Sequence, residues 1–260
     1  MNTVQGKTAI VTGGGKGIGF QCCWQLLRNG AKTVAIFGRA NTNNEQSASK
    51  LNEEFGAGRA LFFPVDVADF EELETAFKKA VKSLGGFDIL VNNAGIFNDG
   101  EWQREIQVNF GAVVKSTILA YDHMGKHKGG KGGIIVSVSS VLALLDIGLI
   151  PVYTATKHAI MAFTVNLKSQ YERTGVSVRV LCPGVTDTPL IRYSKGKHLE
   201  IFDATIVERI QNSLARQPCE YVGKALVEAI EKGANGTVWV CQTSDPPFEV
   251  ELAKYDCIKF

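Results

Sequence analysis

The chain has 260 residues, of which 45% are hydrophobic and 21% are charged, and its formal net charge is +2. These values are ordinary for a globular protein with a large core. The small net charge and the lack of a Lys/Arg run argue against a nucleic-acid surface, so no nucleic-acid partner is predicted.

The longest nearly apolar run, 134–150, contains three serines, an aspartate and a glycine. It is too short and too polar for a membrane span, so we predict a buried strand and loop there and no membrane partner. The first residues lack the regions of a secretory signal. The six cysteines include no CxxC pair, which favours reduced thiols. We therefore expect a cytoplasmic protein.

Apolar runs typical of strands alternate with helical patterns along the chain. The predicted strands are 7–12, 33–37, 60–65, 87–91, 133–138, 177–182 and 237–241, and the predicted helices are 17–29, 44–55, 69–84, 101–125, 153–173 and 219–232. Apolar strands separated by helices indicate a parallel sheet covered on both faces. We predict an α/β fold: one doubly wound (Rossmann) domain over 1–260, with about seven strands and helices on both faces.

The first strand leads into TGGGKGIG, residues 12–19, which opens the first helix. Glycines let the backbone approach a pyrophosphate, and free N–H groups at a helix start attract its negative charge. A glycine-rich turn without a ligand is the alternative. The pattern favours dinucleotide binding, with contacts from Gly13, Lys16, Gly17, Ile18 and Gly19.

The end of the second strand bears on the choice between NAD and NADP. NAD sites usually carry an acidic residue there, which bonds the ribose hydroxyls. This chain has Gly38 and Arg39 instead, and no carboxylate before Glu45. A guanidinium binds a ribose 2′-phosphate with charge-assisted hydrogen bonds, and Lys16 could reach the same phosphate. We predict a preference for NADP(H), with NAD(H) possible.

His123 and His127 lie four residues apart and could in principle bind zinc. No third ligand stands nearby in the sequence, which favours a solvated helix end, and no metal site is predicted.

Segment 186–218 is the least regular part of the chain. It follows a predicted strand and mixes apolar with charged residues. We predict a substrate-loop insertion that covers a ligand at the carboxyl edge of the sheet. The role of the tail, 244–260, is open.

Five further motifs follow the glycine turn in order: ILVNNAGIF (89–97), QVNF with Asn109, VSVSS ending at Ser140, YTATK (153–157) and LCPGVTDT (181–188). Together they resemble the short-chain dehydrogenase/reductase family over nearly the whole chain. Within it, DILVNNAG, GGIIVSVSS and PVYTATKH are most similar to the group of 15-hydroxyprostaglandin dehydrogenase and insect alcohol dehydrogenases.

The resemblance implies a catalytic tetrad. Tyr153 would be the general acid/base, Lys157 its activator and Ser140 the residue that orients the carbonyl. Ser140 is preferred over Ser139 because it stands thirteen residues before Tyr153, the usual family spacing. Asn109, through a kink and a water in its helix, would connect Lys157 to solvent.

Each role fits the chemistry of hydride transfer. The reduction of a ketone also needs a proton, and the reverse reaction needs a base. A tyrosine titrates near ~10, but an ammonium one turn away and an oxidised nicotinamide both favour phenolate. Lowering its pKa by ~3 units needs about 4 kcal/mol.

The resemblance also implies further cofactor contacts. Asp66 would meet the adenine beside the Val67 backbone, and Tyr153 and Lys157 would lie at the nicotinamide ribose. Cys182 is interpreted as a buried packing residue. The riboses, carboxamide and pyrophosphate would be lined by Asn93, Ala94, Gly95, Pro183, Gly184 and Thr188.

The substrate should contact 96–102, 141–150 and 188–215. Of these, VLALLDIGLI (141–150) is mostly aliphatic, and TPLI followed by LEIF extends that character. An apolar pocket favours a small lipophilic alcohol or carbonyl substrate, although these side chains could equally pack the insertion onto the sheet. We predict an oxidoreductase, with a catalytically silent dinucleotide-binding regulatory or scaffold protein as the alternative. Helices 101–125 and 153–173, with Ile118, Phe163 and Leu167, are the expected contacts of a homodimer or homotetramer.

Overall fold

The computed structural model describes residues 3–40, 44–192, 194–242 and 245–252. Within these residues, eight strands form one sheet in the order β3-β2-β1-β4-β5-β6-β7-β8. Neighbouring strands from β3 to β7 pair in parallel, and β8 is antiparallel to β7. The strands are β1 Thr8–Thr12, β2 Thr33–Gly38, β3 Ala60–Pro64, β4 Ile89–Asn92, β5 Gly133–Val138, β6 Val176–Pro183, β7 Thr237–Cys241 and β8 Phe248–Val250.

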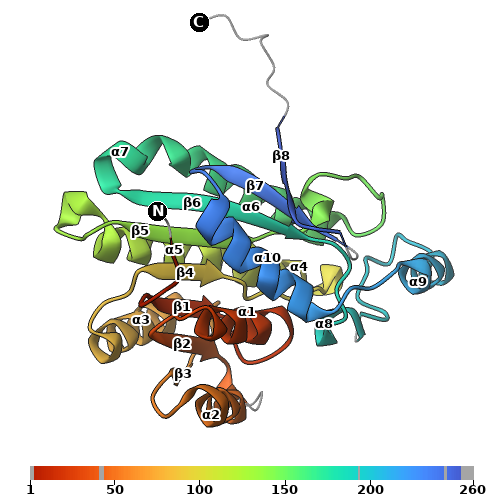
Figure 1. Ribbon diagram of the computed structural model, residues 1–260. Coiled ribbons are helices and arrows are strands. Elements are labelled where there is room, and N and C mark those ends of the chain that lie inside the picture. Colours follow the sequence, from red (N-terminus) through yellow and green to blue (C-terminus); the bar gives the residue numbers. More distant parts are fainter. Residues whose placement is uncertain (1–2, 41–43, 193, 243–244, 253–260) are drawn as a thin grey trace, which may run out of the picture.

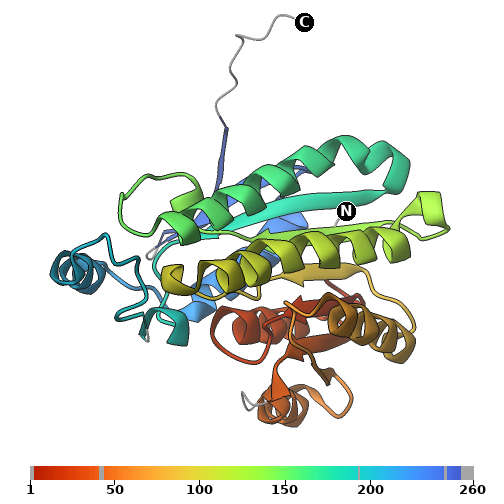
Figure 2. The same cartoon turned by 180° about the vertical axis from the view of Figure 1, so that it is seen from behind.

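Helices cover both faces of the sheet, which confirms the predicted α/β class (Figure 1). The helices α1, α2 and α10 lie on one face, and α3, α5 and α6 lie on the other, which Figure 2 shows from behind. The helices are α1 Gly17–Arg28, α2 Asn44–Phe55, α3 Phe70–Leu84, α4 Trp102–Ile106, α5 Ala112–Met124, α6 Pro151–Asn166, α7 Tyr171–Thr174, α8 Pro189–Arg192, α9 Ala204–Ser213 and α10 Cys219–Lys232.

Two large apolar clusters fix these helices to the sheet. One lies between the sheet and α1, α2 and α10, where Leu26 and Leu226 are fully buried. The other lies between the sheet and α3 and α5, around Leu73 and Leu90. Burying one such side chain stabilises the fold by about 1.5–3 kcal/mol. Because side chains of successive strand residues point to opposite faces, the same strands pack against helices on both sides of the sheet.

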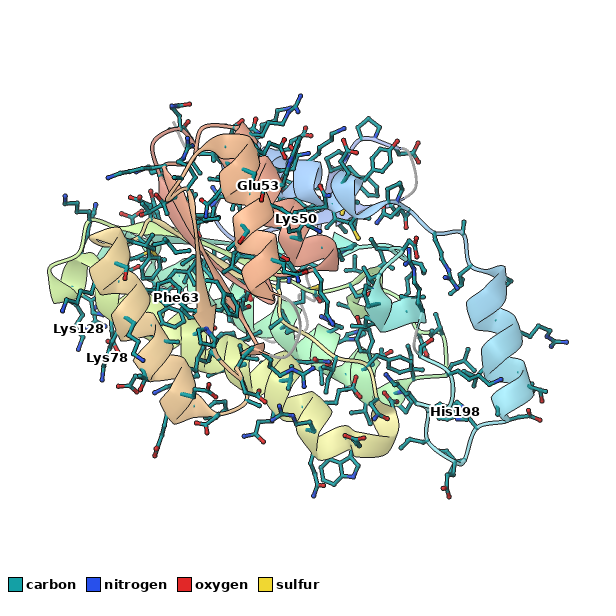
Figure 3. All side chains as sticks on the ribbon, turned by 90° about the horizontal axis from the view of Figure 1, so that it is seen from below. Lys50, Glu53, Phe63, Lys78, Lys128 and His198 are labelled. Atoms are coloured by element: carbon teal, nitrogen blue, oxygen red, sulfur yellow. The ribbon has the colours of Figure 1, made fainter. Side chains whose placement is uncertain are left out.

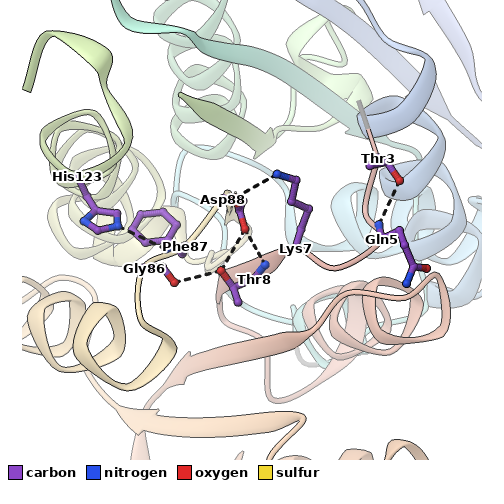
Figure 4. A network of polar contacts seen from close by, with 8 residues as sticks. All are labelled: Thr3, Gln5, Lys7, Thr8, Gly86, Phe87, Asp88 and His123. Atoms are coloured by element: carbon purple, nitrogen blue, oxygen red, sulfur yellow. Dashed lines mark hydrogen bonds and ion pairs between the residues drawn. The ribbon is translucent and has the colours of Figure 1, made fainter. Parts of the chain in front are cut away.

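The end of the sheet at which β1 and β4 begin is closed by polar contacts (Figure 4). The Asp88 carboxylate accepts hydrogen bonds from the Thr8 amide at 2.9 Å and from the Lys7 ammonium at 3.2 Å. The Phe87 ring stacks on His123 with centroids 4.9 Å apart, and the His123 Nε2 accepts a bond from the Phe87 amide. These contacts are structural and lie at the end opposite the carboxyl ends of the strands.

This arrangement corrects the prediction of a solvated helix end at both histidines. Only His127 is exposed, whereas His123 is half-buried against Phe87, and this burial lowers the pKa of His123.

The connections that leave β1 and β4 run to opposite sides of the sheet. From β1 the chain moves to β2, whereas from β4 it moves to β5 on the other side. Such a switch point leaves a crevice beyond the carboxyl ends of the two strands, where ligands of doubly wound folds bind. The site is therefore set by topology before any side chain is considered.

Candidate active site

The glycine turn after β1 is packed tightly against the end of β4. Gly13 has φ +66°, and a Cβ there would lie 2.9 Å from the Ala94 Cα. A Cβ on Gly19 would lie 2.2 Å from the Gly13 carbonyl oxygen. Neither contact is possible for a real side chain, so the turn requires glycine at both positions. The backbone is left open toward the crevice.

The start of α1 is suited to an anion. Lys16, which precedes the helix, makes no side-chain capping bond, and the first turn contains no acidic residue. The first N–H groups of a helix lack intrahelical acceptors and carry partial positive charge. Gly17, Ile18 and Gly19 line the crevice at this point. The turn thus fits the pyrophosphate of a dinucleotide.

Asn93 holds the turn rather than facing the crevice with its amide. Its Nδ2 donates to the Thr12 carbonyl at 2.9 Å and to the Gly13 carbonyl at 3.3 Å, and its backbone N–H donates to Thr12 Oγ1 at 3.0 Å. The side chain therefore connects the ends of β1 and β4. Its backbone, with Ala94 and Gly95, forms the wall of the crevice.

The crevice is a cavity of about 720 Å³ that gathers almost every residue singled out in the sequence. Asn109 is the exception among them, because it lies behind the wall and is fully buried. The predicted residues that line the cavity are Gly13, Lys16, Gly17, Ile18, Gly19, Arg39, Asp66, Val67, Asn93, Ala94, Gly95, Ser140, Tyr153, Lys157, Pro183, Gly184 and Thr188.

Asp66 has a partner that the sequence did not suggest. Its carboxylate pairs with the Arg104 guanidinium of α4 and accepts a hydrogen bond from the Ala68 amide at 3.1 Å. Burial opposes ionisation, but the Ala68 N–H, Arg104 and then Arg39 outweigh it and lower the pKa of Asp66. The residues Arg39 and Asp66 therefore share one end of the cavity.

Tyr153 and Lys157 lie one turn apart near the start of α6. This helix begins with Pro151 at its first position, where the missing N–H costs nothing. The Lys157 Nζ lies 5.4 Å from the centre of the Tyr153 ring and donates to the Val138 carbonyl at 3.3 Å. Lys157 is only 5% exposed. Both side chains therefore meet the cavity at the carboxyl end of β5.

The two serines after β5 have different partners. The Ser139 hydroxyl donates to the Lys157 carbonyl at 2.7 Å, which ties β5 to α6. The Ser140 hydroxyl accepts a bond from the Leu142 amide at 3.2 Å. Its proton is therefore not used in that bond, and Ser140 lines the cavity. This difference supports the choice of Ser140 as the residue that can donate to a ligand.

Asn109 sits in a π-turn, Gln107–Gly111, between α4 and α5. Its Oδ1 accepts a bond from the Ile96 amide at 2.8 Å, and its Nδ2 donates to the Ile96 carbonyl at 2.9 Å and to Thr156 Oγ1 at 3.2 Å. Such turns widen a helix and are frequent at functional sites. The irregularity stands where the resemblance implied a kink, and Asn109 joins the loop after β4 to α6.

Proton affinities in the chain itself differ from the sequence-based expectation at Tyr153. Burial raises the pKa of Tyr153 above its usual value, and the charge of Glu105 adds to the rise. Burial lowers the pKa of Lys157 to about 8, against the opposing effects of Cys182 and Glu105. Burial and the charge of Glu105 both oppose ionisation of Tyr153, so the protein alone does not favour phenolate.

Cys182 has the environment of a packing residue. It is fully buried at the end of β6, and burial raises the pKa of its thiol to about 12. A thiol with so little thiolate is a poor nucleophile. The described residues include no group of three or more His, Cys, Asp or Glu that could hold a metal ion.

Sequence reasoning missed two acidic residues beside the tetrad, Asp99 and Glu105. Both are completely buried, and Asp99 accepts hydrogen bonds from the Val152 and Tyr153 amides at 3.0 Å. One signal was available: Glu105 precedes Asn109 by four residues, the spacing that places two side chains on one helix face.

A family model for short chain dehydrogenases matches residues 7–198. The chain is 36% identical to human 15-hydroxyprostaglandin dehydrogenase [NAD(+)], over 99% of this chain and 97% of that protein. It is 29% identical to alcohol dehydrogenase 1 of Ceratitis cosyra, over 92% of each chain. With its doubly wound sheet and its glycine-turn cavity, the chain belongs to the short-chain dehydrogenase family, as its motifs predicted.

Solved structures agree. A short chain dehydrogenase from Burkholderia cenocepacia in complex with NADP superposes with a TM-score of 0.75 at 28% identity, covering 93% of this chain and 98% of that one. A dehydrogenase/reductase from Sinorhizobium meliloti gives a TM-score of 0.75 at 27% identity, covering 92% and 95%. The chain is therefore an oxidoreductase of this family with a nicotinamide dinucleotide cofactor.

Proposed function

We propose that this enzyme interconverts a lipophilic alcohol and its ketone or aldehyde, with NADP(H) as the preferred cofactor. One observation carries the proposal: Ser140, Tyr153 and Lys157 line the same cavity as the glycine turn. A substrate oxygen at this point can meet a hydroxyl donor and an acid/base beside the cofactor.

In the direction of reduction, Ser140 donates a hydrogen bond to the carbonyl oxygen as negative charge develops there. Tyr153 gives its proton to that oxygen, and a nicotinamide cofactor held by the glycine turn and Lys157 would supply the hydride. In the direction of oxidation, Tyr153 accepts the hydroxyl proton. Lys157 stabilises the phenolate by its charge and would bond the nicotinamide ribose.

The high proton affinity of Tyr153 in the protein alone bears on this mechanism. Because burial dominates, the phenol enters the reaction protonated, as reduction requires. Oxidation needs additional positive charge near the ring, which the oxidised cofactor carries. Asn109 and Thr156, which are joined by a hydrogen bond, fix the first turns of α6 against the π-turn and so hold Lys157 in place.

The preference for NADP(H) rests on charge at one end of the cavity. Arg39 and Lys16 both line it, and the electrostatic effect of Arg39 on Asp66 places the guanidinium at the same end. A 2′-phosphate would gain charge-assisted bonds there. The 15-hydroxyprostaglandin dehydrogenase relatives are named for NAD(+), whereas one solved relative holds NADP. The Gly38-Arg39 sequence at the end of β2 favours the ribose 2′-phosphate of NADP(H).

The substrate class follows from the far wall of the cavity. Segments 141–150 and 189–214 contribute aliphatic side chains and few polar atoms. Figure 3 shows α9 apart from the sheet, with the loop that carries His198 running between α9 and the main body. An apolar wall that converges on a few polar groups favours a lipophilic substrate. The aliphatic side chains of this wall include Leu142, Leu149, Leu190, Val207, Ile210 and Leu214.

The experiment is a screen of NADPH and NADH oxidation against lipophilic ketones and aldehydes, with the reverse reactions of the alcohols measured alongside. We expect turnover of several lipophilic compounds, faster with NADPH than with NADH. Cofactor binding without turnover of any compound in either direction would favour a catalytically silent binding protein instead.

A further inference from the structure

Two carboxyl groups are completely buried behind the active site. Asp99 lies in a short 3-10 turn, Asp99–Glu101, and Glu105 lies in α4. Each is 0% exposed. A buried carboxylate without a cationic partner is costly unless hydrogen bonds or a proton compensate it. The two carboxyl groups differ in how their burial is compensated.

Asp99 is compensated by backbone donors. Its two carboxyl oxygens accept bonds from the amides of Val152 and Tyr153, both at 3.0 Å. These are N–H groups of the first turn of α6, where the helix carries partial positive charge. Asp99 therefore fixes the start of the helix that presents Tyr153, and its anionic form is the one these donors stabilise.

Glu105 is compensated less well: the Asn98 backbone N–H lowers its pKa, but this effect is smaller than those of burial and Asp99. Its Oε1 lies 3.5 Å from the Asn109 Nδ2, and its Oε2 has no hydrogen-bond partner among the residues that the structure describes. The Glu105 carboxyl lies within hydrogen-bonding reach of Asp99, and burial, followed by the charge of Asp99, raises the pKa of Glu105 to about 8. Two carboxyl groups can be joined by a hydrogen bond only if one carries a proton. The proton belongs on Glu105.

The ionisable neighbours of Glu105 come from each element around it. Asp99 comes from the 3-10 turn, and Tyr153 and Lys157 come from α6. On the side of α4, the Arg104 guanidinium is paired with Asp66. Segment 194–199, which carries Lys197 and His198, adjoins the 3-10 turn, because the Lys197 carbonyl accepts a hydrogen bond from the Asp99 amide. Glu101 belongs to the 3-10 turn itself.

We infer that Glu105 is a positioning residue of the active site: a buried carboxylic acid that shares its proton with Asp99 and whose charge state sets how readily Tyr153 and Lys157 lose theirs. The inference rests on the proposed function. When Glu105 loses its proton, the new negative charge disfavours phenolate at Tyr153 and favours ammonium at Lys157. Oxidation of the alcohol, which needs the phenolate, is then held back at high pH.

The first test concerns Glu105 alone and needs no cofactor or substrate. Infrared titration of the protein in deuterated buffer should show a protonated carboxyl band at neutral pH. The band should disappear as the pH passes about 8 and should be missing from Glu105→Gln. A spectrum in which every carboxyl group is ionised at neutral pH would overturn the inference, and it requires no variant to fold.

The second test is a phenolate absorbance titration of the NADP⁺ complex, with Tyr153→Phe as the blank. Ionisation of Tyr153 should be broad in the wild type, because two interacting groups titrate together. In Glu105→Gln, and in the apolar variant Glu105→Leu, it should be a single transition about one pH unit lower. Glu53→Gln, a change of an exposed carboxyl on α2, should not move it.

The same shift should appear in the pH profile of kcat/KM for alcohol oxidation. A purely structural role for Glu105 would lower activity at all pH values without moving the midpoint, and superposable midpoints would contradict the inference. If no alcohol is oxidised at all, the proposed function fails, while the infrared and absorbance titrations still decide the role of Glu105.

Discussion

Arg39 is the residue on which the cofactor preference depends most. A hydrogen bond to a charged group contributes about 1.5–3 kcal/mol, which corresponds to roughly 10- to 100-fold in affinity. We expect Arg39→Ala to weaken NADPH binding by that factor and to leave NADH binding nearly unchanged, as measured by quenching of protein fluorescence. Gly38→Asp, which adds a carboxylate at the end of β2, should shift the preference toward NADH. Equal losses for both cofactors in Arg39→Ala would place the 2′-phosphate elsewhere.

Glu105 also links stability to pH. Its pKa rises from 4.5 to about 8 on folding, chiefly through burial, so the folded protein holds a proton that the unfolded chain releases. Wild-type stability is therefore lost as the pH rises from about 4.5 to about 8, by at most about 1.4 kcal/mol per pH unit. Glu105→Gln lacks this loss. In urea unfolding, the free energy of unfolding of the variant should rise relative to that of the wild type between about pH 4.5 and about pH 8. A difference between the two proteins that does not change with pH would contradict the assignment.

At the scale of single residues, the sequence predicted which side chains gather in the cavity but not the state of each. Tyr153, Lys157 and Ser140 were identifiable because they belong to spaced motifs. The proton affinity of Tyr153 was not, because it depends on how deeply the ring is buried and on Glu105. Asp99 and Glu105 resemble ordinary polar positions in the sequence, and only the packing of α4 against α6 buries them.

Among the elements, α9 is the one whose role follows least from the sequence. Its Asp203 cap accepts a bond from the Thr205 amide at 2.8 Å, and Val207, Ile210 and Leu214 face the cavity. We expect Ile210→Asp to raise KM for a lipophilic substrate by about 10-fold or more, because it places a charge in an apolar wall. The affinity for NADPH should not change.

Ile206→Asp is the matched control for that variant, since Ile206 is 44% exposed on the same helix and does not line the cavity. Steady-state kinetics should show a raised KM for Ile210→Asp, on the cavity side of α9, and an unchanged KM for Ile206→Asp, on its exposed side. Equal KM values for the two would remove α9 from the substrate site.

Regular elements were predictable wherever local pattern and tertiary context agree. The seven predicted strands are found within two residues of their expected ends, because runs of buried β-branched side chains admit few alternatives. The strand β8 was missed, since it spans three residues with little burial. Helix 101–125 was predicted as one helix with a kink at Asn109, and the structure has a π-turn there, where Asn109 bonds the Ile96 backbone.

For the whole molecule, the exposed apolar side chains on α4 and α5 are the candidate contacts of an assembly. Trp102 is 49% exposed and Ile118 is 51% exposed, and apolar groups that gather on a surface commonly mark a protein contact. We expect a homodimer or homotetramer that Ile118→Glu dissociates, as measured by sedimentation velocity. Ile201→Glu, which changes an 82% exposed residue in the 186–218 segment, should leave the assembly intact. A wild-type monomer would contradict this prediction.

At the same scale, no helix among the described residues is long and apolar enough to cross a membrane. The cavity is lined by residues that follow β1, β4, β5 and β6 and by residues of α8, α9 and the segments beside them. We expect the cofactor at the ends of β1 and β4 and the substrate beside α9, because the residues at both places line this one cavity.

The most direct measurement is single-turnover oxidation of bound NADPH by a lipophilic ketone, with wild type compared with Tyr153→Phe and NADPH affinity determined for both. The phenylalanine ring keeps the packing against Phe97, whose centroid lies 5.6 Å from that of Tyr153, and removes only the hydroxyl. We predict unchanged NADPH affinity and a rate lower by about 100-fold or more, the usual contribution of general acid catalysis. An undiminished rate in Tyr153→Phe would contradict the account.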